Sequence, residues 1–383
     1  MAGVAGDPGL VAGAVIGPAR VGPIAHGGHC VTRVDGRVLF VRHAIPGELV
    51  TVRVSEVRSR FARGEVAEVI EAGPQRRTPP CPIADACGGC DFQHLPAPAS
   101  RELKRQVVAE LVVHQTGYEF AGEVEGFDGG FGWRSRMRYH RGADGGLGLR
   151  AARSERVIPL PAEGCRIAAA PIAHPVPPAG HDAVLAVAAA SGVVVGERGE
   201  LPATVTERVG EASFEVAADG FWQPHRLAPA VLTAAVLEAL QPGPGERAFD
   251  LFCGVGLFAA ALVAAGCRVW GVEGDRRAVG LARGNVPEAS FQAGDVARML
   301  RRLPPRAELV VLDPPRSGAG GKVMAEVVAR RPRAIAYVAC DPAALARDLA
   351  VAQELGYRID GLRAFDLFGT THHVECVALL RPV

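Results

Sequence analysis

Lysine is almost absent from this chain of 383 residues, since Lys104 and Lys322 are the two lysines among its 42 basic residues. A biased base composition of the source genome produces such a preference for arginine, so abundant arginine does not by itself indicate a polyanionic ligand. The chain also lacks an excess of charge of either sign, with a formal net charge of +1. A nucleic acid would therefore have to be bound by local basic patches.

Long apolar runs are missing as well. The longest stretch without a charged residue, 251–267, is shorter than the ~20 apolar residues of a membrane span and contains three glycines. It predicts a buried strand, loop and helix. The first basic residue is Arg20, and glycine and proline interrupt the residues before it, so a secretion signal is not expected. These absences predict a cytoplasmic protein that does not contact a membrane.

With 383 residues and 49% hydrophobic content, the chain is expected to form two or three domains. Residues 1–72 hold short alternating apolar runs between glycines, which is typical of a small β-barrel of the oligonucleotide-binding type. Prolines and glycines then open a central segment, 73–222. In residues 223–383 apolar runs alternate with helical patterns, which predicts a doubly wound α/β domain.

Four arginines lie near one end of the predicted barrel: Arg53, Arg58, Arg60 and Arg63. They favour RNA as a ligand, because clustered guanidinium groups neutralise a phosphate backbone. Exposed arginine is ordinary, however, and many small barrels bind no nucleic acid, so a solvated arginine surface remains the alternative.

The nine cysteines are an odd number, and three of them fall within ten residues: Cys81, Cys87 and Cys90. This clustering favours metal binding over disulfides. Cys165 can supply a fourth ligand where the chain folds back, and four cysteines fit either a 4Fe-4S cluster or structural zinc. Zinc sites more often use two separated pairs, so the arrangement predicts an iron-sulfur cluster in a central α/β domain. Its expected role is structural, because no second redox group is evident.

The strongest basic patch lies between Trp133 and Arg156, where seven arginines face two acidic residues. Arg134, Arg136 and Arg138 alternate with other residues, which on a β-strand places three guanidinium groups on one face. With Trp133 nearby, this pattern favours single-stranded RNA as the ligand. The alternative is a polar sheet face paired with scattered acids.

A glycine-rich turn follows an apolar run in the sequence Asp250-Leu-Phe252-Cys-Gly254-Val-Gly256. Such a turn lets a ligand approach the backbone closely at the start of a helix. Glu273 closes the next apolar run, where its carboxylate is placed to accept hydrogen bonds from ribose hydroxyls. These residues alone fit a dinucleotide as well as S-adenosylmethionine.

Four further residues indicate which chemistry this domain performs. Asp313 begins an Asp-Pro-Pro-Arg segment after another apolar run, and this segment beside a glycine-rich turn is characteristic of methyltransferases that act on nucleobases. Asp295 is placed to reach the adenine ring of the cofactor. Cys340 follows the apolar run that begins at Ala334, and with the late carboxylate of Glu375 it suggests covalent group transfer. The structural alternatives are a capped turn, a small buried cysteine and a solvated glutamate.

Taken in order, these motifs resemble those of the 5-methyluridine RNA methyltransferases, especially the ribosomal RNA members with an N-terminal TRAM barrel and an iron-sulfur cluster. The resemblance covers nearly the whole chain and implies a C-terminal, Rossmann-like class I methyltransferase domain that uses S-adenosylmethionine. It also implies an RNA substrate, with 23S ribosomal RNA favoured, and places Gln223 near the cofactor and the transferred methyl group. It rests on Cys81, Cys87, Cys90, Cys165, Asp250-Leu-Phe-Cys-Gly-Val-Gly, Asp313-Pro-Pro-Arg316, Cys340-Asp-Pro and His373-Val-Glu375.

The resemblance implies a covalent mechanism, because C5 of uridine is a poor nucleophile until a group adds at C6. Cys340 would add at C6 as a thiolate, and C5 would then take the methyl group. Glu375 would remove the C5 proton, so that elimination of Cys340 restores the ring. Asp313 would orient the uracil, and Arg316 would support the loop and nearby RNA. The target base must first leave its stack.

The chain departs from the family pattern at three places. Asp341 follows the nucleophile where the family usually has asparagine, and its negative charge is expected to raise the pKa of the thiol. His225 replaces the asparagine of the usual glutamine-x-asparagine, and the usual proline-containing turn before the base reads Phe368-Gly-Thr-Thr. We expect altered substrate contacts at the last two places.

Four alternatives compete with this function. A methyltransferase for the T-loop uridine of transfer RNA fits the same motifs. A radical enzyme with a TRAM barrel is disfavoured because its Cys-x-x-x-Cys-x-x-Cys signature is missing. A non-catalytic RNA-binding protein is disfavoured by Cys340 and Glu375, and a nicotinamide-dependent oxidoreductase explains neither the thiol nor the arginine row. No obligate protein partner is implied.

Overall fold

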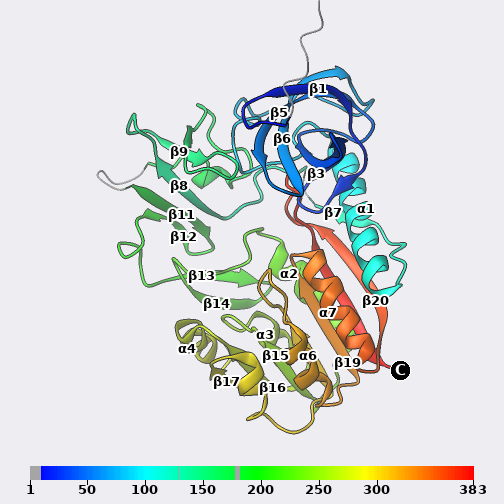
Figure 1. The fold of residues 1–383 in the computed structure, drawn as a ribbon. Helices are drawn as coiled ribbons and strands as arrows, with labels where there is room; N and C mark the ends of the chain where they lie inside the picture. The colour runs from blue at the N-terminus through cyan, green and yellow to red at the C-terminus, as the bar shows by residue number, and fades with distance from the viewer. Residues whose placement is uncertain (1–9, 128, 177–181) are drawn as a thin grey trace, which may run out of the picture. The chain divides into compact units, whose positions relative to one another are not determined.

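The computed structural model describes residues 10–127, 129–176 and 182–383 (Figure 1), so the first nine residues of the predicted 1–72 segment lie outside the described part. The chain forms two compact units. The first runs to Val107 and includes 150–158 and 370–372, and the second comprises 108–149, 159–369 and 373–383.

The first unit is built on a six-stranded sheet, which agrees with the small β domain predicted there. The strand order is β1-β5-β6-β4-β3-β2, and all neighbours are antiparallel except β4 and β6. In β5 the buried side chains are Val50, Val52 and Val54, since alternate residues of a strand point to the same face. The strands are β1 (Val15–Arg20), β2 (Ile24–Ala25), β3 (His29–Val34), β4 (Arg37–Arg42), β5 (Leu49–Val57) and β6 (Phe61–Glu71).

The longest helix, α1 (Ala97–Thr116), begins in the first unit and ends in the second. Leu103 belongs to the core of the first unit, whereas Val108 and Val112 belong to a core of the second. Among the helices of the described residues, none combines the length and apolar composition needed to cross a bilayer.

An eight-stranded sheet forms the centre of the second unit, in the order β17-β16-β15-β18-β19-β21-β20-β7. Strands β15 to β19 are parallel to one another, and β21 is antiparallel to both β19 and β20. The chain order reverses between β15 and β18, which is where ligands bind in doubly wound sheets. The predicted α/β class is confirmed. The strands are β7 (Val124–Gly126), β15 (Arg247–Leu251), β16 (Arg268–Glu273), β17 (Ser290–Ala293), β18 (Leu309–Leu312), β19 (Ala334–Ala339), β20 (Tyr357–Asp366) and β21 (Glu375–Pro382).

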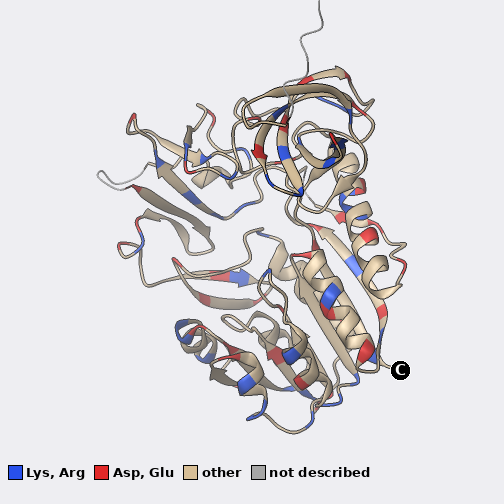
Figure 2. Cartoon of the chain, viewed as in Figure 1, with Lys and Arg blue, Asp and Glu red and all other residues tan. Residues whose placement is uncertain are grey.

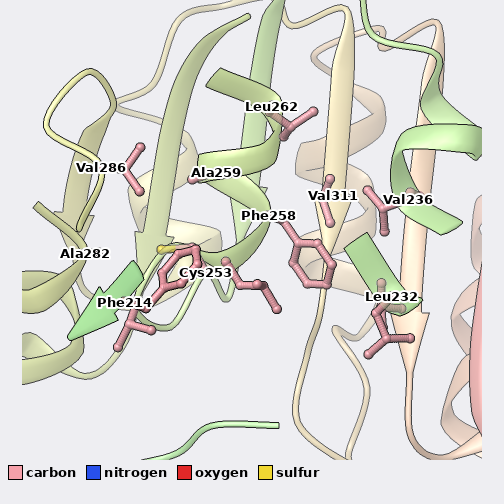
Figure 3. Packing of buried hydrophobic residues seen from close by; sticks show 14 of the residues in the cluster. Phe214, Leu232, Val236, Cys253, Phe258, Ala259, Leu262, Ala282, Val286 and Val311 are labelled. Carbon is pink, nitrogen blue, oxygen red and sulfur yellow. The ribbon is translucent and has the colours of Figure 1, made fainter. Parts of the chain in front are cut away.

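Helices cover both faces of this sheet, and each face has its own core. On one face α2, α3 and α4 pack against residues such as Val311, and Figure 3 shows Leu232 and Phe258 near that strand residue. On the other face α5, α6 and α7 pack against residues such as Val310. Adjacent residues of β18 thus enter different cores, as the alternation of side chains along a strand requires. The helices are α2 (Ala228–Leu240), α3 (Leu257–Ala264), α4 (Arg276–Asn285), α5 (Val296–Leu300), α6 (Gly321–Val328) and α7 (Pro342–Glu354).

The remaining strands form a five-stranded sheet, in the order β10-β9-β8-β11-β12, and a separate hairpin of β13 and β14. Strand β8 pairs antiparallel with both β9 and β11, so it is an inner strand. The elements are β8 (Arg136–Arg141), β9 (Leu147–Arg150), β10 (Val157–Pro159), β11 (Ala183–Ala189), β12 (Gly192–Gly196), β13 (Thr204–Val209), β14 (Ala212–Ala217) and the 3-10 helix η1 (Ala170–Ile172).

Candidate active site

The predicted active-site residues of the second unit follow the strands of the eight-stranded sheet. Glu273 is the last residue of β16, Asp313 comes directly after β18, and Cys340 directly after β19. Because these strands are parallel, their carboxyl ends share one edge of the sheet. Glu375 begins the antiparallel strand β21, whose register sets Cys376 opposite Ala339. The structure therefore brings the predicted nucleophile and base to the same edge.

The glycine turn after β15 has the backbone conformation that a close approach of a ligand needs. Phe252, Gly254 and Gly256 all have positive φ, at 63°, 52° and 94°, and Gly256 caps the start of α3. A Cβ built on Gly254 would meet no atom within 4 Å. The Gly254 N–H donates to a carboxylate oxygen of Glu273 at 3.1 Å, and the other oxygen accepts from the Asp275 N–H at 2.9 Å. The turn and the predicted ribose-binding carboxylate are thus held together.

Asp250 is fully buried beneath this turn. Its Oδ2 accepts from the N–H of Ala259 in α3 at 2.8 Å, whereas its Oδ1 has no hydrogen-bond partner among the described residues. Burial raises the pKa of Asp250 to about 8. A buried polar atom without a partner is costly in free energy, so this oxygen fits a site where a ligand supplies a donor.

Asp313 contacts the residue that the sequence places near the transferred methyl group. Gln223 Nε2 donates to Asp313 Oδ2 at 3.3 Å across 90 residues of sequence. Burial, with the negative charge of Glu273 as a second cause, raises the pKa of Asp313 to about 7. Asp295, the predicted adenine contact, caps α5 by accepting from the Arg298 N–H at 3.0 Å.

Cys340 and Glu375 lie in an environment that disfavours their charged forms. Burial, followed by the charge of the neighbouring Glu375, raises the pKa of the Cys340 thiol to about 12, and Arg316 opposes the shift. Burial and the charge of Asp313 raise the pKa of Glu375 well above its usual range. Asp341, which also raises the pKa of the thiol, accepts from the Ala344 N–H at 2.8 Å and so caps α7. The Cys340 thiol is therefore protonated in the free protein near neutral pH.

Arg316 lies beside a histidine from the last loop of the chain. Its Nη2 is 3.2 Å from His373 Nε2, and the His373 ring packs edge-on against Phe368.

The other two departures from the family pattern, at His225 and in the 368–371 turn, both contact Trp133. The His225 ring stacks on Trp133 at 5.7 Å between centroids, and Trp133 Nε1 donates to the Gly369 carbonyl at 3.2 Å.

The three arginines of the predicted basic row differ in their surroundings. Arg138 is exposed, whereas Arg136 is half-buried, forms an ion pair with Glu207 at 3.0 Å and donates to the Ala218 carbonyl. Arg134 precedes β8, and its Nε donates to the Arg136 carbonyl at 3.0 Å. Figure 2 shows basic and acidic residues interspersed along the chain, in keeping with the low net charge.

The first unit contains the clustered cysteines. Cys81, Cys87 and Cys90 are all buried. The Gly89 N–H donates to Cys87 Sγ at 3.3 Å, and the Thr370 hydroxyl donates to Cys90 Sγ at 3.4 Å. Cys165 is buried in the second unit. Within the described residues, no three histidine, cysteine or acidic side chains are grouped as a metal site requires, so an iron-sulfur cluster is not demonstrated.

Sequence reasoning missed two residues next to this site, Tyr337 and Asp348. Tyr337 is hidden in the apolar run of β19, and its hydroxyl donates to the Asp348 carboxylate. Asp348 is buried in α7 beside Leu345 and Leu349. An acidic residue on the apolar side of a predicted helix is unusual, because buried acids normally have partners. This feature of the sequence could have drawn attention to Asp348.

The fold and the site together define a group-transfer enzyme. Its glycine turn is of the kind that binds a nucleotide-containing cofactor, and the Cys340 thiol lies near the Glu375 carboxyl group. Family models match this chain in two places, the TRAM domain over residues 18–67 and "tRNA (Uracil-5-)-methyltransferase" over residues 305–383. An uncharacterized RNA methyltransferase of Streptomyces avermitilis is 40% identical over 95% of this chain and 97% of its own length. The 23S rRNA (uracil(1939)-C(5))-methyltransferase RlmD of Shewanella sp. (strain W3-18-1) is 30% identical over 94% of each chain.

A solved structure has the same fold over nearly the whole chain. The crystal structure of the Pyrococcus abyssi tRNA (uracil-54, C5)-methyltransferase in complex with S-adenosyl-L-homocysteine superimposes with a TM-score of 0.72. It covers 94% of this chain and 99% of its own, at 22% identity. This chain belongs to the family of S-adenosylmethionine-dependent RNA uracil-C5 methyltransferases. The predicted family, the TRAM barrel and the Rossmann-like domain are confirmed, and the oxidoreductase and non-catalytic alternatives are not supported.

Proposed function

We propose that this enzyme methylates C5 of a uridine in 23S ribosomal RNA through a covalent bond between Cys340 and C6. The observation that carries the proposal is the approach of Cys340 and Glu375 at one sheet edge, through the register of β19 and β21. The RlmD relative, 30% identical over 94% of this chain, supports ribosomal RNA as the substrate. Transfer RNA is the second candidate, since the P. abyssi structure has the same fold at 22% identity.

The residues of this chain supply the nucleophile and the base. The Cys340 thiol gives its proton to water, the thiolate forms the bond to C6, and the electrons of the C5–C6 double bond move toward the C4 oxygen. S-adenosylmethionine held at the glycine turn would supply an electrophilic methyl group to C5 and would leave as S-adenosylhomocysteine. Glu375 then takes the proton from C5, the sulfur–C6 bond breaks and the double bond is restored. Glu375 must be ionised for this step, and its raised pKa makes the carboxylate, once formed, a stronger base.

The residues around the glycine turn fit the cofactor. The unpartnered Oδ1 of Asp250 and the open space at Gly254 support a ligand at this turn. We assign the adenosyl part to the turn, to Glu273 at the end of β16 and to Asp295 after β17, and the methyl end to the region of Asp313. The cofactor set is Gln223, Asp250, Phe252, Gly254, Gly256, Glu273, Asp295 and Asp313.

We assign RNA binding to the barrel and to exposed arginines of the central segment. The exposure of Arg138 and the partial exposure of Arg134 support phosphate contacts by both, whereas the ion pair of Arg136 supports a structural role for that residue. Arg316 and Asp313 would contact the flipped uridine and its surroundings. The corresponding division is residues 1–72 for RNA binding, 73–222 for the central domain and 223–383 for catalysis.

We further propose that Cys81, Cys87, Cys90 and Cys165 hold a 4Fe-4S cluster of structural role. The proposal rests on the spacing of the cysteines, on their burial and on the donors that reach Cys87 and Cys90. All-cysteine ligand sets select soft metals and iron-sulfur clusters. No catalytic step depends on this cluster.

The test of the function is nucleoside mass spectrometry on separated large-subunit ribosomal RNA and transfer RNA. The RNA comes from cells that lack this protein and from the same cells complemented with wild type or Cys340→Ala. We expect 5-methyluridine to disappear from the large-subunit RNA and to return only with wild type. Loss from transfer RNA instead would support the second candidate, and unchanged 5-methyluridine in both would refute the proposal.

A further inference from the structure

The Asp348 side chain of helix α7 contacts the loop that follows β18. Its Oδ2 accepts from the Ala319 N–H at 2.7 Å and from the Gly320 N–H at 3.1 Å, and its Oδ1 lies 3.2 Å from the same Gly320 nitrogen. The Tyr337 hydroxyl donates to Oδ2 as well and accepts from the Ala319 N–H at 2.9 Å. One carboxylate and one hydroxyl thus bind two consecutive amides of the loop.

These amides are the last of the loop that carries Asp313 and Arg316. Gly320 is the N-cap of α6 and makes no side-chain cap of its own, so Asp348 of α7 caps α6 from a neighbouring helix. A carboxylate in this position also matches the positive end of the helix dipole. Gly318 has a φ of +86°, and a Cβ built there would lie 2.6 Å from Asp348 Oδ2. The carboxylate can approach the loop this closely because residue 318 has no side chain. The end of the loop is therefore fixed.

The same two side chains flank the nucleophile along the chain. Tyr337 lies three residues before Cys340 in β19, and Asp348 lies in α7, whose N-cap is Asp341. Both are buried, so their hydrogen bonds are shielded from competing water. The segments on either side of Cys340 are consequently joined to the end of the loop that begins at Asp313.

We propose that Tyr337 and Asp348 form a clamp that sets the position of the Asp313–Arg316 loop relative to Cys340. They are positioning residues, since neither is assigned to touch substrate or cofactor. The proposal rests on the proposed roles of Cys340 and Asp313. A clamp of this kind matters because a small misplacement of a group around a reacting centre lowers the rate steeply.

The alternative is that Tyr337 and Asp348 contribute only to the stability of the fold. Two matched variants distinguish this role from the clamp. Tyr337→Phe removes the hydroxyl of the clamp. Tyr357→Phe removes another buried tyrosine hydroxyl of the second unit, which donates to the Pro332 carbonyl at 2.6 Å. We expect both variants to lose thermal stability, and only Tyr337→Phe to lose kcat, by about tenfold, with a smaller change in KM for the cofactor. Asp348→Asn, which keeps one acceptor oxygen, should retain more activity than Asp348→Ala.

A second readout tests the clamp without relying on turnover. Arg316 lowers the pKa of the Cys340 thiol more than the Asp313 carboxylate of the same loop raises it, so the net effect of this loop is to favour the thiolate. Glu375 and Asp341, which also raise this pKa, belong to other segments and would not move with the loop. A loosened loop should therefore leave less thiolate at a given pH. We expect iodoacetamide to alkylate Cys340 several-fold more slowly in Tyr337→Phe than in Tyr357→Phe at pH 9, as mass spectrometry of the Cys340 peptide would measure.

Each outcome decides the proposal. A slower Cys340 reaction and a lower kcat in Tyr337→Phe, with Tyr357→Phe close to wild type in both, support the clamp. Equal kinetics and equal alkylation in the two variants overturn it and leave a role in stability. If Cys340→Ala retains methylation, the proposed mechanism fails, and the alkylation comparison still decides whether the loop is clamped.

Discussion

The sulfur atoms of Cys340 and Cys90 lie in opposite surroundings within their respective units. Near Cys340, burial and the carboxylate of Glu375 raise the pKa of the thiol to about 12. Near Cys90, the Thr370 hydroxyl donates to the sulfur at 3.4 Å, and Arg42 donates to the Cys90 carbonyl at 2.8 Å. Hydrogen-bond donors stabilise an ionised ligand sulfur, whereas carboxylates hold the proton on a thiol until it reacts. The comparison teaches that the groups around the sulfur atom distinguish a candidate nucleophile from a candidate ligand when both cysteines are shielded from water.

The largest expected effect concerns the reactive sulfur. Glu375→Gln removes the proposed base but leaves Cys340 able to add at C6, so the C5 proton stays in place and elimination stops. We expect a covalent adduct between protein and RNA to accumulate under turnover conditions, visible on a denaturing gel. The double variant Glu375→Gln/Cys340→Ala is the control and should form no adduct. Absence of an adduct in the single variant would contradict the assigned roles.

The next effect concerns the cysteines of the first unit. Cys87→Ser should remove a thiolate ligand and lower the iron and sulfide content of protein purified without oxygen. Cys30→Ser is a matched control, since Cys30 is also buried in the first unit but donates to the Ala44 carbonyl at 3.3 Å. It should keep the iron content of wild type. Equal iron in both variants would argue against Cys87 as a ligand, and zinc in place of iron would favour the zinc alternative.

A smaller effect follows from the acids near the glycine turn. Asp313 has a pKa raised to about 7, so it is neutral below and ionised above that pH. S-adenosylmethionine carries a positive sulfonium and S-adenosylhomocysteine does not. The ratio of their affinities should therefore shift toward S-adenosylmethionine by up to about tenfold between pH 6 and pH 8, as calorimetry would measure. In Asp313→Asn the affinity ratio should depend less on pH, and the remaining dependence should come from Asp250, whose pKa is about 8. An affinity ratio independent of pH in wild type would count against the placement of the sulfonium near Asp313.

The smallest effect is expected at Asp341. Asparagine and aspartate cap helices almost equally well, so Asp341→Asn should keep the cap on α7. Removing its negative charge should lower the pKa of Cys340 slightly, because Asp341 contributes less than Glu375 or Asp313. We expect methylation rates within about twofold of wild type and slightly faster alkylation of Cys340. A loss of activity by an order of magnitude would show that the carboxylate has a direct role.

Several features of the fold follow from local sequence. The apolar runs that predict parallel strands correspond to β15, β16, β18 and β19, because a strand buried on both faces needs a continuous apolar segment. The glycine turn was also predictable, since positive φ at Gly254 and Gly256 is a property of the residue type. The surroundings of Arg136 were not predictable, because its partner Glu207 is 71 residues away in β13.

The sequence by itself determined the fold class, the family and the positions of the motifs at strand ends, because periodicity, glycine turns and short motifs depend on residues close together in the chain. Only the tertiary structure decided which of these residues meet. Gln223 reaches Asp313, Cys376 pairs opposite Ala339, and Asp348 binds the amide of Ala319. These contacts depend on strand register and on the packing of helices against a sheet, which arise from the whole chain and cannot be read from any one segment of it.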